Sequence, residues 1–260
     1  MRDDFVYIHL EPIANLIYSR GLSVEDFLRG IPRIPTHILL LNTPINDNLS
    51  VEPHTQLNTI SGTFNIRKYL TNPKAEHVSW LDYSHAEGLE ELLPEEIAEL
   101  LFLGHMHTHY TTPFSYKLQN EFVFLSLGSK HLKVYYRKLK NFYPVLNDSL
   151  IRHTRLAFNE RRMFRRYDNF AEIPQSMLRQ LTPILSNGII FAFDQAFEQG
   201  KQYRIPILVV ADNGQSPIYR SRTSLYNKAK QVAVLRYNMT SGHWHLVITD
   251  SHAFEDDQFY

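Results

Sequence analysis

The chain has 260 residues, of which 43% are hydrophobic and 21% are charged, and its 27 basic residues balance its 27 acidic residues. This composition supports a buried core and excludes a disordered or fibrous protein. The absence of cysteine excludes disulfides, thiolate metal sites and cysteine catalysis.

The beginning of the sequence argues for a particular compartment. Two acidic residues stand where a secretory signal needs basic ones, and no apolar run is long enough to span a bilayer. We therefore expect a soluble, cytoplasmic protein without a membrane partner.

The first third of the chain contains patterns typical of helices and patterns typical of strands. Apolar residues between Phe5 and Ile17 recur at near-helical spacing and predict a helix, and the capping-box spacing from Ser23 to Asp26 predicts a second one. The runs THILLLN and HVSWLDY, residues 36–42 and 77–83, are typical of buried strands.

The middle of the chain holds the strongest local signals. Residues 92–106 predict a helix, because Pro94 suits the first helical position and the two glutamates after it suit the positive end of the helix dipole. Residues 121–139 predict an antiparallel hairpin, since two aromatic and β-branched runs flank a glycine turn.

The last part of the chain is helical first and then β. A long helix is predicted from Asn147 to about Tyr167, followed by shorter helical segments, a strand over residues 204–210 and a second hairpin over residues 231–249. Together these elements predict an α+β fold with a helical middle segment. They form either two lobes, 1–145 and 146–260, or a single domain.

Three histidines follow Gly104 at alternate positions, namely His105, His107 and His109. On a strand all three would point to one face and could bind a divalent metal ion through imidazole nitrogens, whereas in a loop they would be ordinary surface histidines. A second pair, His243 and His245, is predicted to share one face of the final hairpin.

The segment GHMHTH, residues 104–109, resembles the last histidine motif of the calcineurin-like metallophosphoesterases, and FLSLGS, residues 124–129, is similar to the strand that follows it in that family. The resemblance implies a metal-dependent phosphoesterase. The other metal-binding motifs of that family have no counterparts in this sequence, so its two-metal site is not predicted.

Charge is distributed unevenly along the chain. Residues 82–99 carry seven acidic and no basic residues, whereas residues 130–166 carry eleven basic residues against Asp148 and Glu160. On a helix, four arginines of this basic segment would line one stripe. They are Arg152, Arg155, Arg162 and Arg166.

The hairpin before this helix adds further candidates. Lys133, Tyr135 and Arg137 alternate along one strand, and a face of cations and an aromatic ring can bind a nucleic-acid backbone and stack a base. The arginine stripe could instead pair with the acidic side chains of the same chain or of a homo-oligomer, or could form a solvated surface. The acidic candidates are Glu95, Glu96 and Glu99.

No catalytic residue can be assigned from the sequence, which contains no phosphate loop, dinucleotide fingerprint or nucleophile elbow. We therefore expect a non-catalytic binding or regulatory protein that recognises a polyanion such as nucleic acid, or an acidic protein partner. The alternative is a metal-dependent hydrolase that uses the histidine cluster. Only this alternative requires a cofactor, a divalent metal ion.

Overall fold

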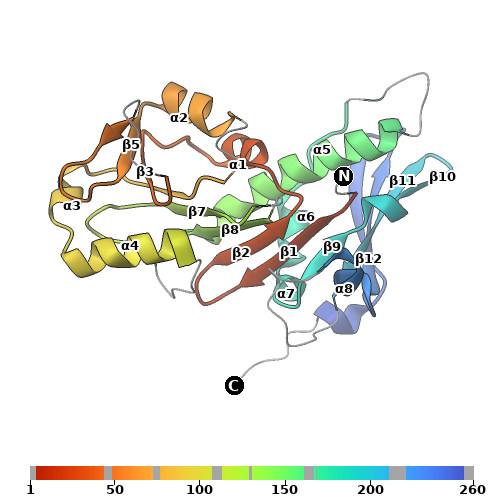
Figure 1. Ribbon diagram of the computed structural model, residues 1–260. Coiled ribbons are helices and arrows are strands. Elements are labelled where there is room, and N and C mark those ends of the chain that lie inside the picture. Colours follow the sequence, from red (N-terminus) through yellow and green to blue (C-terminus); the bar gives the residue numbers. More distant parts are fainter. Residues whose placement is uncertain are drawn as a thin grey trace. The chain divides into compact units, whose positions relative to one another are not determined.

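The computed structural model describes residues 4–43, 49–72, 77–106, 113–128, 131–160, 167, 169–210 and 221–254. The fold is α+β, with helices and a mostly antiparallel arrangement of strands (Figure 1). The chain divides into two compact units. Unit 1 comprises Met1–Leu10, Tyr18–Leu22 and Tyr143–Tyr260, and unit 2 comprises Glu11–Ile17 and Ser23–Phe142.

Unit 2 contains strands in the order β8-β7-β6-β3-β5-β4. Its strands are β3 (His37–Leu40), β4 (Ser50–Val51), β5 (Asn58–Ser61), β6 (Trp80–Asp82), β7 (Phe122–Ser126) and β8 (His131–Tyr136). Its helices are α1 (Val24–Gly30), α2 (Thr63–Leu70), α3 (Glu87–Glu90) and α4 (Pro94–Met106).

The core of unit 2 forms around one ring from α1. Phe27 packs edge-on against Trp80, Phe122 and Phe124, with ring centroids 5.1–5.7 Å apart. Helix α1 begins as its sequence predicts, because Ser23 and Asp26 form a complete capping box. The hairpin predicted over residues 121–139 is confirmed as β7 and β8, whose register pairs Phe122 with Tyr136.

Unit 1 contains strands in the order β13-β12-β11-β9-β1-β2, and β10 also pairs with β11. Its strands are β1 (Val6–Glu11), β2 (Leu16–Arg20), β9 (Ile189–Phe191), β10 (Phe197–Gln199), β11 (Gln202–Val209), β12 (Lys230–Asn238) and β13 (His243–Ile248). The last residue of β1 and the first two residues of β2 belong to unit 2. Its helices are α5 (Phe142–Glu160), α6 (Gln175–Arg179), α7 (Thr182–Leu185) and α8 (Arg222–Tyr226), with single 3-10 turns at Phe193–Gln195 and Ser251–Phe254. A further 3-10 turn, Leu139–Asn141, precedes α5.

The helix predicted between Phe5 and Ile17 is wrong, because this segment forms β1 and β2. Asn15 has a φ of 47° and donates its backbone N–H to the carbonyl of Pro12, so a turn separates the two strands. Side chains on both faces of these strands are buried, which places apolar residues at positions that also fit a helical period. The hairpin predicted over residues 231–249 is confirmed as β12 and β13.

An aromatic cluster covers one face of the strands in unit 1. Phe158 of α5 lies 5.1 Å from the ring of Tyr203, and Tyr237 lies 4.9 Å from both Phe170 and Trp244. Because side chains alternate along a strand, the residues between these aromatic positions lie on the opposite face. None of the helices within the described ranges is long and apolar enough to cross a bilayer.

Candidate functional site

The structure places two of the predicted polyanion-binding residues in the interior of unit 2. Lys133 and Tyr135 both have an exposed fraction of 0%, and the Lys133 ammonium lies 5.3 Å from the centre of the Tyr135 ring. Burial lowers the pKa of Lys133 to about 8, and the nearby carboxylate of Glu11 opposes part of this shift. Neither side chain can reach an external ligand in this structure.

Arg137 comes from the same hairpin but holds a neighbouring loop. Its Nε donates to the carbonyl of Asn120 at 2.6 Å, and its guanidinium lies 5.2 Å from the centre of the Phe114 ring. A further bond from the guanidinium reaches the carbonyl of Ser115 at 3.3 Å. These contacts fasten residues 113–120 and give Arg137 a structural role.

The arginine stripe of α5 is described only in part. Arg155 is exposed on the helix, whereas Arg152 is half-buried and donates to the carbonyl of Gly21 at 2.9 Å. Arg162 and Arg166 lie outside the described residues, so their part in a polyanion site stays a prediction. Among the acidic residues predicted as internal partners, Glu96 is bound by Lys117 instead.

The histidine cluster is also described only in part. His105 is an exposed residue in the last turn of α4, so a helix enters the motif that resembles a metallophosphoesterase. His107 and His109 lie outside the described residues. Within the described ranges, no group of three or more histidine or acidic side chains could hold a metal ion.

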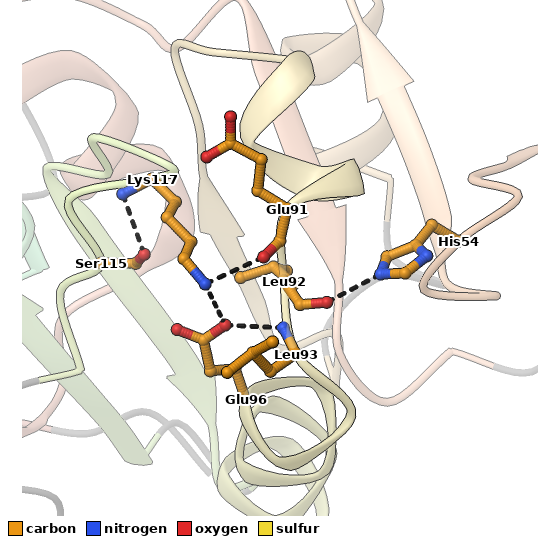
Figure 2. Close-up of polar contacts among 7 residues, drawn as sticks. All are labelled: His54, Glu91, Leu92, Leu93, Glu96, Ser115 and Lys117. Atoms are coloured by element: carbon orange, nitrogen blue, oxygen red, sulfur yellow. Dashed lines mark hydrogen bonds and ion pairs between the residues drawn. The ribbon is translucent and has the colours of Figure 1, made fainter.

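A pocket of about 210 Å³ lies between α4 and residues 113–118 of unit 2. Its walls are mainly apolar, with Leu100, Leu103 and Phe114 among the lining residues. Figure 2 shows the polar contacts beside it: the Lys117 ammonium donates to the Glu96 carboxylate at 2.6 Å and to the carbonyl of Glu91 at 2.9 Å.

The carboxylate of Glu96 also caps the N-terminus of α4. Glu96 accepts the backbone N–H of Leu93 at 2.7 Å, and the bond from Lys117 together with this contact keeps the pKa of Glu96 below its usual value. His54 contributes a further contact in Figure 2, between its Nε2 and the carbonyl of Leu92 at 2.7 Å. Glu96 therefore stays ionised in an ion pair with Lys117, and it stabilises the start of the helix.

The face of β10, β11, β12 and β13 that lies opposite the aromatic cluster of unit 1 presents a different arrangement. Figure 1 shows β10, β11 and β12 side by side, and the strand register aligns one residue from each of the four strands in a row. The row, which we call the arginine row, consists of Phe197, Arg204, Arg236 and His245. It spans three strand spacings, or about 14 Å.

Side-chain alternation explains why this row lies on the face opposite the aromatic cluster. Tyr203, Tyr237 and Trp244 point into the aromatic cluster, so their neighbours Arg204, Arg236 and His245 point to the other face. Phe197 is 45% exposed and His245 is exposed, while the two arginines are half-buried. Helix α8 packs over Leu208, further along β11 on the same face.

The two rows that flank the arginine row contain no acidic residue among their described members. One row consists of the polar residues Gln199, Gln202, Asn238 and His243, and the other of Pro206, Val234 and Val247. The sequence prediction that His243 and His245 share a face is confirmed by their exposure on either side of buried Trp244.

The arginine row brings two like charges and two unpartnered Nε atoms together. Arg204 and Arg236 are direct register partners, and like charges at such positions repel. The Nε atoms of both arginines are shielded from solvent and have no hydrogen-bond partner among the described residues, which costs free energy. The terminal nitrogen of Arg204 donates to the amide oxygen of Gln202 at 3.0 Å.

An anion bound over this face would reduce the repulsion between the two arginines and would accept hydrogen bonds from their guanidinium groups. Sequence reasoning missed Arg204 and Arg236 because they are 32 positions apart and only the β11–β12 register brings them together. The alternation of each strand was the available signal, but it does not determine which residues become partners.

Comparison with known proteins gives no relative for this chain. No protein-family model matches the sequence, no curated protein matches it, and no solved structure matches the fold.

Proposed function

We propose that the protein is a non-catalytic binding or regulatory protein that recognises a polyanion through the arginine row of unit 1. The observation that carries the proposal is the direct opposition of Arg204 and Arg236 between exposed Phe197 and exposed His245, with no acidic residue among the described members of the flanking rows. Arginines at directly opposed strand positions suit phosphate oxygens, which accept hydrogen bonds from the planar fork of the guanidinium group.

The neighbours of the arginine pair support the same interpretation. His245 adds a third group that can carry a positive charge, and exposed Gln199 and His243 add hydrogen-bonding groups beside the pair. The exposed Arg155 of α5, together with Arg162 and Arg166, remains a second proposed contact region for the same class of ligand.

The proposal is tested by measuring the affinity of the whole chain for three polyanions: a short labelled oligonucleotide, inorganic polyphosphate and poly-glutamate. The matched variants are Arg204→Gln combined with Arg236→Gln, and Arg67→Gln, which removes an exposed arginine of α2. We expect the double variant to lose at least ten-fold in affinity for the phosphate polymers, since contacts to charged groups contribute roughly 1.5–3 kcal/mol each.

The control variant should bind like the unsubstituted protein. Binding of poly-glutamate alone would identify an acidic protein partner in place of a phosphate polymer. If none of the three polymers binds, or if the double variant binds as well as the Arg67→Gln control, the proposal is wrong.

A further inference from the structure

The surroundings of the arginine row favour one kind of polyanion, an inference that rests on the proposed function. Phe197 stands at one end of the row, 45% exposed, as the register partner of Arg204. His245 stands at the other end, as the register partner of Arg236. An exposed ring at each end of an arginine pair supplies flat surfaces beside a positive charge.

Duplex nucleic acid cannot use such rings, because its bases are already stacked on one another and its outer surface is the phosphate backbone. A single strand can turn its bases away from the backbone and stack them on aromatic side chains. A phosphate-only polymer has no base to stack. Phe197 therefore distinguishes a single strand from the other phosphate polymers.

The rows on either side of the arginine row differ in polarity and in exposure. Pro206, Val234 and Val247 form an apolar row on one side, but Pro206 and Val234 are buried, so the accessible surface consists of the arginine row and its polar side. On the other side, Gln199 and His243 can donate and accept hydrogen bonds at base edges. Apolar, cationic and polar rows thus lie in parallel across adjacent strands, about 7 Å apart along each strand.

We infer that the arginine row binds single-stranded nucleic acid, with phosphates between Arg204 and Arg236 and a base stacked on Phe197. The backbone contacts are independent of sequence, because the guanidinium groups meet only phosphate. Stacking tolerates every base, so the site has little sequence preference.

The test measures binding of labelled single-stranded RNA, single-stranded DNA, the matched duplex and unlabelled polyphosphate by fluorescence anisotropy, with polyphosphate as a competitor. Three substitutions are compared at the ring: Phe197→Ala, Phe197→Leu and Phe197→Tyr. Phe64→Ala, which removes a ring that is 75% exposed on α2, is the control. Trp fluorescence and circular dichroism establish that each variant is folded.

We expect single strands to bind at least ten-fold more tightly than the duplex. Phe197→Ala and Phe197→Leu should each weaken single-strand binding by roughly five- to one hundred-fold, the range measured for removing one stacking partner. Phe197→Tyr and Phe64→Ala should bind normally, and polyphosphate affinity should be unchanged in all four variants. A difference between RNA and DNA would identify which single strand the site prefers.

Equal binding of duplex and single strand, with no effect of Phe197→Ala, would overturn this inference and leave the proposed polyanion binding intact. Failure of every polymer to bind would overturn both. A loss of single-strand affinity in Phe197→Leu that is absent in Phe197→Tyr supports stacking specifically, because the leucine keeps an apolar side chain and removes only the ring.

Discussion

Arg204 of β11 and Arg236 of β12 are direct register partners in unit 1, and the Nε atoms of both are shielded from solvent without a hydrogen-bond partner among the described residues. We expect this opposition to destabilise the protein when no ligand is bound, since like charges at opposed strand positions repel. The arrangement is easier to understand as a feature that a ligand completes.

The first prediction is that removing one charge stabilises the free protein. Arg236→Gln should raise the free energy of unfolding by about 0.2–1 kcal/mol at low salt, because it relieves the repulsion with Arg204. The gain should shrink as salt screens the charges. Thermal unfolding at low and high ionic strength measures both effects, with Arg67→Gln as the control. A lower thermal midpoint in Arg236→Gln would show that the pair stabilises the fold.

The second prediction concerns the arginine stripe of α5. If Arg162 and Arg166 contact phosphates, replacing both by glutamate should make the plot of log affinity against log salt concentration shallower by about 1.4 for single strands. The thermal midpoint should stay unchanged. If they instead pair with acidic residues of this chain or of a second copy, the same variant should unfold at lower temperature or dissociate an oligomer. A variant unchanged in both measurements would show an ordinary solvated surface.

The third prediction is a pH dependence from Lys133. Its pKa is about 8 in the folded protein and near the usual 10.5 when unfolded, so the unfolded state holds more protons between these values and stability rises with pH there. Lys133→Met should therefore stabilise the protein near pH 7, by about 3 kcal/mol at most, and the gain should vanish as pH approaches 10.

Urea unfolding at several pH values measures this effect, and exposed Lys140→Met is the control. Polyanion affinity of Lys133→Met should equal that of the unsubstituted protein, because this lysine is buried. A pH-independent loss of stability would show that the buried ammonium makes favourable contacts that outweigh its desolvation.

The fourth prediction tests the alternative function as a metal-dependent hydrolase. If His105, His107 and His109 bind a metal, the purified protein should contain a first-row divalent ion, and the content should fall in His105→Ala combined with His107→Ala. Elemental analysis provides the measurement, with His243→Ala combined with His245→Ala as a matched control on β13. Metal content that is the same in both double variants would exclude the cluster as the ligand set.

Local signals in the sequence predicted the elements whose partners are close in the chain. The two hairpins pair strands joined by short turns, and Pro94 with its glutamates marks the start of α4. The exception is the pair β1 and β2, which also has a short turn but was predicted as a helix. Side chains on both faces of these strands are buried, so their apolar residues also fit a helical period, and the pairing of β1 with β9, about 180 residues later, leaves no local signal.

The same limit applies to the candidate site. Alternation predicted correctly that His243 and His245 share a face, because both lie on one strand. Alternation also put Lys133 and Tyr135 on one face, but it could not show that this face is covered. The opposition of Arg204 and Arg236 depends on the register of β11 and β12, which includes an irregularity after Ile207 and is set by tertiary packing.

The most direct test of polyanion binding at the arginine row is the salt dependence of single-strand binding by the unsubstituted protein and by Arg204→Gln combined with Arg236→Gln. Each neutralised phosphate of a single strand contributes about 0.7 to the log–log slope, because it releases a condensed counterion. We expect the double variant to have a slope shallower by about 1.4 and an unchanged fold. Identical slopes for the two proteins would contradict binding at this row.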